Sequence, residues 1–169
     1  MTRLPEMFFH CREEGEWVHK HTDFLFNNKR VVVFALPGAF TPTCSNYQLP
    51  GYEEKYNDFI SLGISDIYCL SVNDAFVMNA WFKSQDIKNV RPLPDGSGEF
   101  TYAMGMSVNK ANLGFGFRSW RYAMVVNNGE IEMMFEEPGK VGNCPVDPYE
   151  VSDPDTVLAY LKNTYTKEN

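Results

Sequence analysis

The stretch VVVFALPG, residues 31–38, carries the clearest fold signal in the sequence. Its six consecutive apolar residues, three of them β-branched valines, predict a strand that is buried on both faces, and Pro37-Gly38 ends that strand. A second run of this type, IYCLSV at residues 67–72, predicts a second buried strand. Strands buried on both faces are typical of an α/β sheet that helices cover on either side.

Helical patterns follow both strands. Apolar side chains recur at helical spacing over residues 43–62, where Pro50-Gly51 predicts a kink and Gly63 ends the helix. A second, shorter helix is predicted at residues 75–83. The buried face of the first helix is predicted to carry Tyr52, Tyr56, Phe59 and Ile60.

The second half of the chain begins irregularly. Residues 91–118 are rich in Gly and Pro and are predicted to hold at most a short helix, at 99–104. Asn128-Gly129 then supplies the positive-φ positions of a tight turn between two apolar runs, which predicts a β-hairpin over 122–135. Ser152-Asp153-Pro154-Asp155 predicts the capped start of a final helix.

The predicted element order is strand, helix, strand, helix, hairpin, helix. This order is typical of a thioredoxin-like α/β fold, with a central mixed sheet flanked by helices. The first 30 residues are expected to add only edge structure, with one helical turn at 22–26. Because the sequence contains no repeat, linker or low-complexity tract, residues 1–169 are expected to form a single domain.

Composition and charge disfavour several classes of function. The chain of 169 residues is 44% hydrophobic and 22% charged, which is ordinary for a globular domain. Its formal net charge of −7 argues against nucleic acid and anionic membranes as partners, because both bind clustered Lys and Arg. No signal peptide or membrane-spanning stretch is evident, so a cytoplasmic protein is expected. No metal or bound cofactor is expected, since His19-Lys20-His21 lacks further ligands at useful spacing.

Cys44 is the strongest candidate for a reactive residue. Thr41 is placed as a helix N-cap and Pro42 as the first helical residue, so Cys44 takes the third helical position. Unpaired amide groups and the helix dipole favour negative charge there, and the thiolate is the reactive form of a cysteine. From this position alone, a reactive thiol and an inert thiol packed behind the helix start stay equally open.

The residues around Cys44 also resemble those of a known family. Pro37, Thr41 and Cys44 form the pattern Pro-x3-Thr-x2-Cys, which resembles the active-site signature of the peroxiredoxins. The fuller stretch PGAFTPTCS is similar to the type II or peroxiredoxin-5 subfamily, and in style to the peroxiredoxin domain of bacterial peroxiredoxin–glutaredoxin hybrids. The resemblance extends over residues 17–34, 70–81, 91–100, 114–126 and 151–161.

The resemblance implies a peroxidase that reduces hydrogen peroxide and organic hydroperoxides. Cys44 would attack the hydroperoxide and become a sulfenic acid, while Thr41 would hydrogen-bond the thiolate and the peroxide. Pro37 would shield the sulfenic acid from water, and Arg121 would hold its guanidinium against sulfur and substrate. Arg118 has an equal claim by residue type alone, but a spacing of three predicts that the two arginines point to opposite faces of an extended segment.

A second thiol must then reduce the sulfenic acid. Glutathione with glutaredoxin is the expected reductant, and thioredoxin is the alternative. Since the chain ends at Asn169 without a glutaredoxin, glutaredoxin is expected to be a separate protein.

Cys144 is a candidate resolving cysteine, through a Cys44–Cys144 disulfide. It lies in a turn-rich loop that is expected to be exposed and mobile, and the part around residues 142–146 resembles an insertion relative to the hybrids. Cys69, in the middle of a buried strand, is expected to be inert. The family also implies a homodimer.

Two rival functions stand beside the peroxidase. A general disulfide oxidoreductase on the same fold would use two closely spaced cysteines, but the four cysteines of this chain include no CxxC pair. A non-catalytic redox-sensing module would let peroxide oxidise Cys44 without turnover, and the sequence leaves this alternative open.

Overall fold

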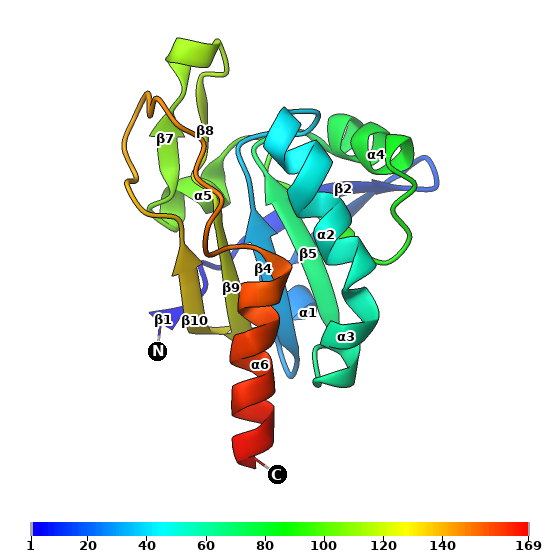
Figure 1. The fold of residues 1–169 in the computed structure, drawn as a ribbon. Helices are drawn as coiled ribbons and strands as arrows, with labels where there is room; N and C mark the ends of the chain where they lie inside the picture. The colour runs from blue at the N-terminus through cyan, green and yellow to red at the C-terminus, as the bar shows by residue number, and fades with distance from the viewer. Residues whose placement is uncertain (1, 169) are drawn as a thin grey trace.

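A six-stranded mixed β-sheet forms the centre of the computed structural model, which describes residues 2–168 (Figure 1). Its strands are β1 (Thr2–Arg3), β4 (Arg30–Ala35), β5 (Asp66–Ser71), β6 (Arg91–Pro94), β9 (Tyr122–Asn127) and β10 (Glu130–Glu136). They lie in the order β1-β10-β9-β4-β5-β6. β4, β5 and β6 are mutually parallel, whereas β9, β10 and β1 are added in antiparallel pairs. The predicted mixed central sheet is therefore confirmed.

Helices cover the sheet because each central strand sends alternate side chains to opposite faces. The helices are α1 (Thr22–Phe26), α2 (Leu49–Glu54), α3 (Tyr56–Ser61), α4 (Ala75–Ser84), α5 (Glu99–Ala103) and α6 (Pro154–Glu168). Within β4, Val32 and Phe34 point to one face, and Val31 and Val33 to the other. All four are fully buried, which is why this strand reads as one continuous apolar run.

The two faces support separate hydrophobic clusters. The helix-side cluster packs the sheet against α2, α3, α4 and α6, and includes Val32, Phe34, Cys44, Tyr52, Phe59, Cys69, Met78, Trp81, Val125 and Leu158. The hairpin-side cluster packs the opposite face against α1, α5 and the N-terminal segment, and includes Val31, Val33, Phe9, Cys11, Leu25, Phe100, Trp120, Tyr122 and Cys144. Each cysteine is thereby assigned to one face of the sheet.

Most predicted elements are found. β4 and β5 are the two buried strands, and α4 begins after Asp74, whose carboxylate accepts a hydrogen bond from the Val77 amide. β9 and β10 form the predicted hairpin, with φ of 50° at Asn128 and 79° at Gly129. The final helix is capped by Asp153, which accepts from the Thr156 amide at 3.1 Å.

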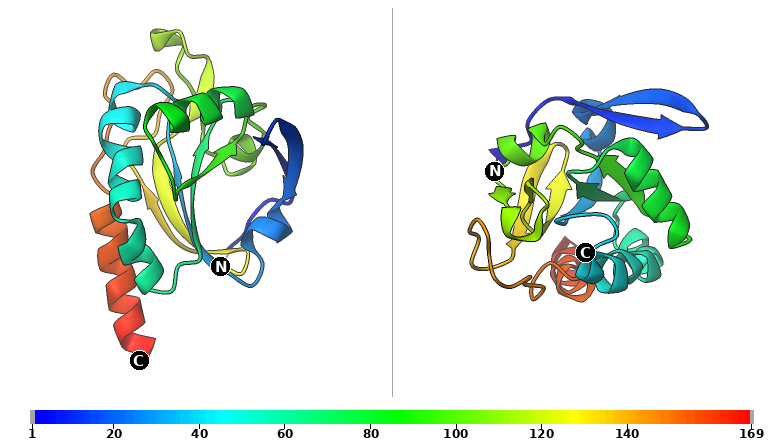
Figure 2. Two further views of the ribbon diagram at one scale, coloured as in Figure 1. Left: turned by 90° about the vertical axis from the view of Figure 1, so that its right-hand side faces the viewer. Right: turned by 90° about the horizontal axis from the view of Figure 1, so that it is seen from above.

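Two irregular regions were under-predicted. The N-terminal residues form an antiparallel hairpin of β2 (Phe8–Glu13) and β3 (Glu16–His21), which lies across the sheet from α6 (Figure 2). Residues 91–118 contain, besides α5, the strand β6 and the pair β7 (Ser107–Asn109) and β8 (Phe117–Ser119). These strands are only three to six residues long, so few alternations mark them in the sequence.

The helical region after β4 is segmented differently from the prediction. A π-helical turn, η1 (Cys44–Gln48), precedes α2, and Lys55 separates α2 from α3 with φ of −91° and ψ of 5°. These irregularities flank Pro50-Gly51, where a kink was predicted. A proline ring crowds the preceding turn of a helix, and the widened π-helical turn relieves that contact. The break at Lys55 also shifts the helical phase, so Ile60 is 38% exposed rather than buried.

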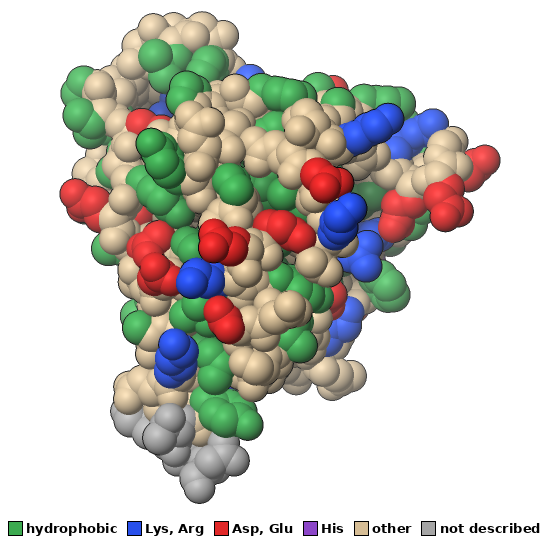
Figure 3. Space-filling model, turned by 45° about the vertical axis from the view of Figure 1, so that its right-hand side comes forward, with side chains coloured by type: hydrophobic (Ala, Val, Ile, Leu, Met, Phe, Trp, Pro, Cys, Tyr) green, Lys and Arg blue, Asp and Glu red, His purple; other side chains and the backbone are tan. Residues whose placement is uncertain are grey.

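The surface mixes both signs of charge. On the face shown in Figure 3, acidic and basic side chains alternate with apolar ones. Of the helices that the structure describes, none has both the length and the apolar character to cross a membrane.

Candidate active site

The site begins where β4 ends. Pro37 and Gly38 are buried, Phe40 takes a left-handed φ of 64°, and the helical backbone starts at Pro42, as predicted. Left-handed backbone is costly for an aromatic residue and is tolerated where the surroundings enforce it, often at functional sites. The following π-helical turn carries Cys44, whose side chain is fully buried in the helix-side cluster.

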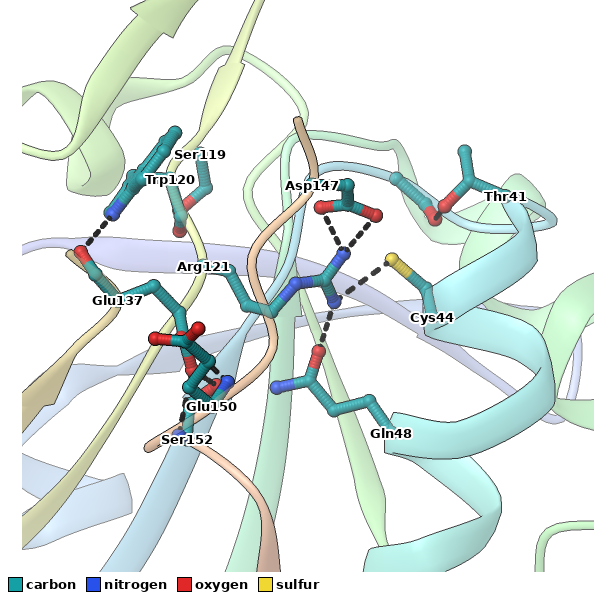
Figure 4. A network of polar contacts seen from close by, with 11 residues as sticks. Thr41, Cys44, Gln48, Ser119, Trp120, Arg121, Glu137, Asp147, Glu150 and Ser152 are labelled. Carbon is teal, nitrogen blue, oxygen red and sulfur yellow. Dashed lines mark hydrogen bonds and ion pairs between the residues drawn. The ribbon is translucent and has the colours of Figure 1, made fainter. Parts of the chain in front are cut away.

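Arg121 meets Cys44 from the neighbouring strand. It immediately precedes β9, which pairs with β4, and its side chain lies on the same face as Ala123 and Val125 of the helix-side cluster. Its Nη1 atom donates to the Cys44 sulfur at 3.4 Å, and the residue is only 1% exposed (Figure 4). A buried cation thus contacts the buried sulfur of Cys44.

The Arg121 guanidinium is held by two further side chains. Nη1 also donates to Gln48 Oε1, four residues after Cys44 in the π-helical turn, and Nη2 donates to both carboxylate oxygens of Asp147 at 2.7 and 2.9 Å. Burial by itself lowers the pKa of Arg121, but the charges of Cys44 and Asp147 and their hydrogen bonds raise it overall. The guanidinium is therefore a permanent, oriented cation.

Thr41 and Pro37 lie in the same loop. The Thr41 hydroxyl donates to the Gly38 carbonyl oxygen at 2.7 Å, so its hydrogen is directed at the loop backbone rather than at the sulfur. The Pro37 carbonyl oxygen accepts from Arg118 Nη1 at 3.1 Å. A methyl group added to Gly38 would lie 2.6 Å from that Nη1 atom, so the close approach of Arg118 depends on glycine at this position.

The two arginines do not diverge as predicted. Arg118 reaches Pro37, and Arg121 reaches Cys44, so both guanidinium groups converge on the 37–44 segment. The prediction failed because it assumed one extended segment, whereas β8 ends at Ser119 and β9 begins only at Tyr122. The interruption lets side chains three residues apart turn toward the same loop.

The other three cysteines are also free and buried. Cys69 lies in the helix-side cluster, where burial raises the pKa of its thiol well above the ordinary value and the charge of Cys44 adds to that rise, against a lowering by Arg121. Burial also raises the pKa of Cys11. Cys144 was expected to be exposed, but its side chain is 9% exposed and packs into the hairpin-side cluster, while Val141 and Val146 of its loop face solvent.

Sequence reasoning missed Gln48, Asp147 and the reach of Arg118. Gln48 had a usable signal, because a residue four positions after Cys44 shares its helix face. Asp147 had none, since only the folding of the late loop brings it to Arg121. Within residues 2–168, no three His, Cys, Asp or Glu side chains gather as metal ligands would.

Comparisons with known proteins show the family of this chain. The redoxin family matches residues 9–158. A peroxiredoxin of Rhizobium etli is 63% identical over 146 residues, covering 86% of this chain and 82% of that protein. The hybrid peroxiredoxin hyPrx5 of Haemophilus influenzae is 53% identical over 159 residues, covering 94% of this chain and 64% of the hybrid.

Solved structures show the same fold. Reduced Prx3 of Vibrio vulnificus, determined in complex with hydrogen peroxide, superposes with a TM-score of 0.88 at 38% identity, covering 97% of this chain and 96% of that one. The thioredoxin-like fold is thereby confirmed, as is the resemblance read from Pro37, Thr41 and Cys44. The chain therefore belongs to the redoxin family, and within it to the peroxiredoxins, which are peroxidases.

Proposed function

We propose that Cys44 is the peroxidatic cysteine and that it reduces hydrogen peroxide and organic hydroperoxides. The single observation that carries this proposal is the 3.4 Å contact between Arg121 Nη1 and Cys44 Sγ in a buried turn. The thiolate attacks one peroxide oxygen, so an S–O bond forms and the O–O bond breaks. Sulfur loses two electrons, the peroxide gains them, and the departing oxygen takes up a proton and leaves as water or an alcohol.

The surrounding residues have distinct roles in this step. Arg121 stabilises the thiolate and the charge that builds on the departing oxygen, because its donors are fixed before the reaction. Thr41 hydrogen-bonds sulfur and substrate after its hydroxyl turns away from the Gly38 carbonyl. Pro37, buried at the start of the loop, shields the sulfenic acid from water.

Glutathione is the proposed reductant. One glutathione condenses with the sulfenic acid, releasing water and leaving a mixed disulfide, and a second thiol, delivered through glutaredoxin, restores Cys44 and releases oxidised glutathione. The similarity to a hybrid peroxiredoxin supports this route over thioredoxin.

An internal Cys44–Cys144 disulfide is the second route to a reduced site. The Cα atoms of the two cysteines would have to come within about 4.4–6.8 Å. Because Cys144 packs into the hairpin-side cluster and Cys44 into the helix-side cluster, this route requires residues 138–146 to move.

A homodimer is proposed as the assembly. Phe40, Tyr47 and Phe117 are each more than half exposed, and they come from the segments that carry Thr41, Cys44 and Arg118. Exposed aromatic side chains of this kind are enriched at protein interfaces. Analytical ultracentrifugation should give twice the monomer mass, and Phe117→Asp should lower it.

Turnover measurements test the function and its competitors together. Hydrogen peroxide consumption is followed with glutathione plus glutaredoxin, or with thioredoxin, for the wild type, Cys44→Ser and Cys144→Ser. We expect Cys44→Ser to lose turnover completely and Cys144→Ser to keep it with glutathione. Unimpaired turnover in Cys44→Ser would sink the proposal, and oxidation of Cys44 without turnover with any reductant would favour a redox sensor.

The same proteins test the disulfide. Mass analysis of the peroxide-treated wild type under non-reducing conditions should reveal a Cys44–Cys144 linkage that Cys144→Ser lacks. If the wild type forms no such linkage, Cys144 has no resolving role.

A further inference from the structure

Asp147 occupies the outer side of the Arg121 guanidinium. Both of its carboxylate oxygens accept from Nη2, whereas Cys44 and Gln48 share Nη1 (Figure 4). The Nε atom of Arg121 is buried without a hydrogen-bond partner among the described residues, so it does not help to orient the group. The carbon of the guanidinium also lies 5.7 Å from the centroid of the Tyr149 ring, but the hydrogen bonds that orient the group come from one anchor on each terminal nitrogen.

The two anchors belong to different parts of the fold. Gln48 is carried by the π-helical turn that also carries Cys44, so it moves with the sulfur. Asp147 lies in the segment 138–151, which is part of the connection between β10 and α6. In Figure 4, Asp147 points onto the guanidinium from the side opposite Gln48.

Glu137 fixes the base of the segment 138–151. Its carboxylate, fully buried, accepts from the backbone amides of Glu150, Val151 and Ser152 at 2.7 to 2.9 Å, and from the Ser152 hydroxyl at 2.7 Å. Its own amide donates to the Arg121 carbonyl oxygen at 3.2 Å. The segment that presents Asp147 is thus tied to the backbone of the arginine that Asp147 holds.

We propose that Asp147 is a positioning residue that fixes the Arg121 guanidinium so that Nη1 is directed at the Cys44 sulfur. This inference rests on the proposed function, since it acts only through Arg121. Hydrogen bonds on both terminal nitrogens set the plane of the guanidinium. Without Asp147, only Nη1 is hydrogen-bonded, and the group can rotate about that nitrogen. Rate depends steeply on such placement, because a shift of about 1 Å can cost on the order of a hundredfold.

The charge of Asp147 should slow the oxidation of Cys44, whereas its hydrogen bonds to Arg121 should speed it. A carboxylate on Nη2 offsets part of the positive charge that Arg121 offers the thiolate. However, the Asp147 side chain is 47% exposed, so solvent and salt screen its charge, whereas the two hydrogen bonds still orient the guanidinium. Removal of Asp147 should therefore slow the reaction rather than accelerate it.

The test compares two reactions of the same thiol. Single-turnover oxidation of Cys44 by hydrogen peroxide needs an oriented Arg121, whereas alkylation by iodoacetamide at the same pH needs only a thiolate that the reagent can reach. We expect Asp147→Ala to slow oxidation about tenfold and alkylation less than about twofold. Asp147→Asn, which keeps an acceptor oxygen without the charge, should stay within about threefold of the wild type.

Three controls make the result specific. Glu150→Gln removes an equal charge from the same segment, at an exposed side chain, and should change neither rate. Sodium acetate should restore part of the oxidation rate of Asp147→Ala by supplying a carboxylate to Nη2. Asp147→Ser replaces Asp147→Ala if the latter does not fold, as judged by circular dichroism.

Each outcome has a defined meaning. Oxidation of Asp147→Ala at the wild-type rate or faster, equal losses in both reactions, or inhibition by acetate would each overturn the positioning role. Arg121→Ala is measured in parallel. Unimpaired turnover in Cys44→Ser would mean that the proposed function has failed. If Cys44→Ser is inactive but Arg121→Ala keeps the wild-type oxidation rate, the role of Arg121 and the present inference fail together. If Arg121→Ala slows oxidation while the Asp147 variants do not respond, only the present inference has failed.

Discussion

Cys44 and Cys69 are two equally buried thiols in the same cluster, yet only one is equipped for chemistry. Both side chains are fully buried, and both belong to the helix-side cluster. Cys69 sits in the middle of β5, where burial raises the pKa of its thiol and leaves it protonated. Cys44 sits in the π-helical turn and contacts Arg121 Nη1. Burial keeps a thiol protonated and unreactive unless a cation and hydrogen-bond donors are placed to stabilise its thiolate.

The largest effect is expected when the cation beside Cys44 is removed. Arg121→Gln keeps a planar amide near the sulfur but loses the charge and most donors, so Cys44 becomes more like Cys69. We expect the single-turnover rate with hydrogen peroxide to fall about 100- to 1,000-fold, as for the loss of a preorganised donor to a developing anion. Arg121→Lys keeps the charge without the forked pair of donors, so its rate should lie between those of the wild type and Arg121→Gln. A loss below about tenfold for Arg121→Gln would mean that the helix start alone activates Cys44.

A substitution remote from the sulfur should change the stability of the fold without changing the reaction rate of Cys44. Glu132 accepts two hydrogen bonds from Arg30, at 3.0 and 2.6 Å, and one from Tyr160 at 2.5 Å, joining β10 to β4 and α6. We expect Glu132→Gln to lower the free energy of unfolding by about 1.5–3 kcal/mol in urea titrations, because these bonds involve a charged group. The peroxide rate per folded molecule should not change. A changed rate would connect this network to the site.

The same carboxylate predicts a pH dependence of stability. Burial alone raises the pKa of Glu132, but the hydrogen bonds from Arg30 and Tyr160 lower it overall. A lowered pKa in the folded state means that the stabilisation is present above about pH 4.5, the ordinary value for Glu, and is lost as pH falls through the folded-state value. Urea titrations from pH 7 to 3 should show the stability of Glu132→Gln falling less steeply than that of the wild type.

Arg118 should have a smaller effect than Arg121, because it contacts the loop rather than the sulfur. Its bond to the Pro37 carbonyl fixes the segment that leads to Thr41 and Cys44. We expect Arg118→Ala to lower kcat/KM for hydrogen peroxide about five- to tenfold. Gly38→Ala, which would crowd the same guanidinium, should give a similar loss. If Arg118→Ala matched Arg121→Gln, the two arginines would act as one unit.

The smallest effect is expected at Cys69 itself. Cys69→Ala should change the peroxide rate less than about twofold, because its protonated thiol lacks nucleophilic character. In the native protein at pH 7.5, peptide mass spectrometry should find iodoacetamide on Cys44 and none on Cys69. Labelling of Cys69 at a comparable rate would remove the contrast between the two thiols.

The sequence by itself determined the elements whose signals are local. The apolar run over residues 31–36, the Asn128-Gly129 turn and the helix start at Pro42 each depend on side chains close in sequence, and each is found. The Thr41 hydroxyl, predicted to cap that helix, donates to the Gly38 carbonyl oxygen instead. The family pattern of Pro37, Thr41 and Cys44 is likewise local. Short strands such as β7 and β8 were missed because three residues give too few alternations to distinguish them from a loop.

Only the tertiary structure decided how the residues around the sulfur come together, although the family resemblance had already implied Arg121. The pairing of β9 with β4 brings Arg121 to Cys44 across 77 positions of the chain, and the late loop adds Asp147. Arg118 reaches the same loop because β8 and β9 are interrupted, and Cys144 turns into the hairpin-side cluster. A sequence records the type of a side chain, but its direction depends on strand register and loop closure, which arise when distant segments pack together.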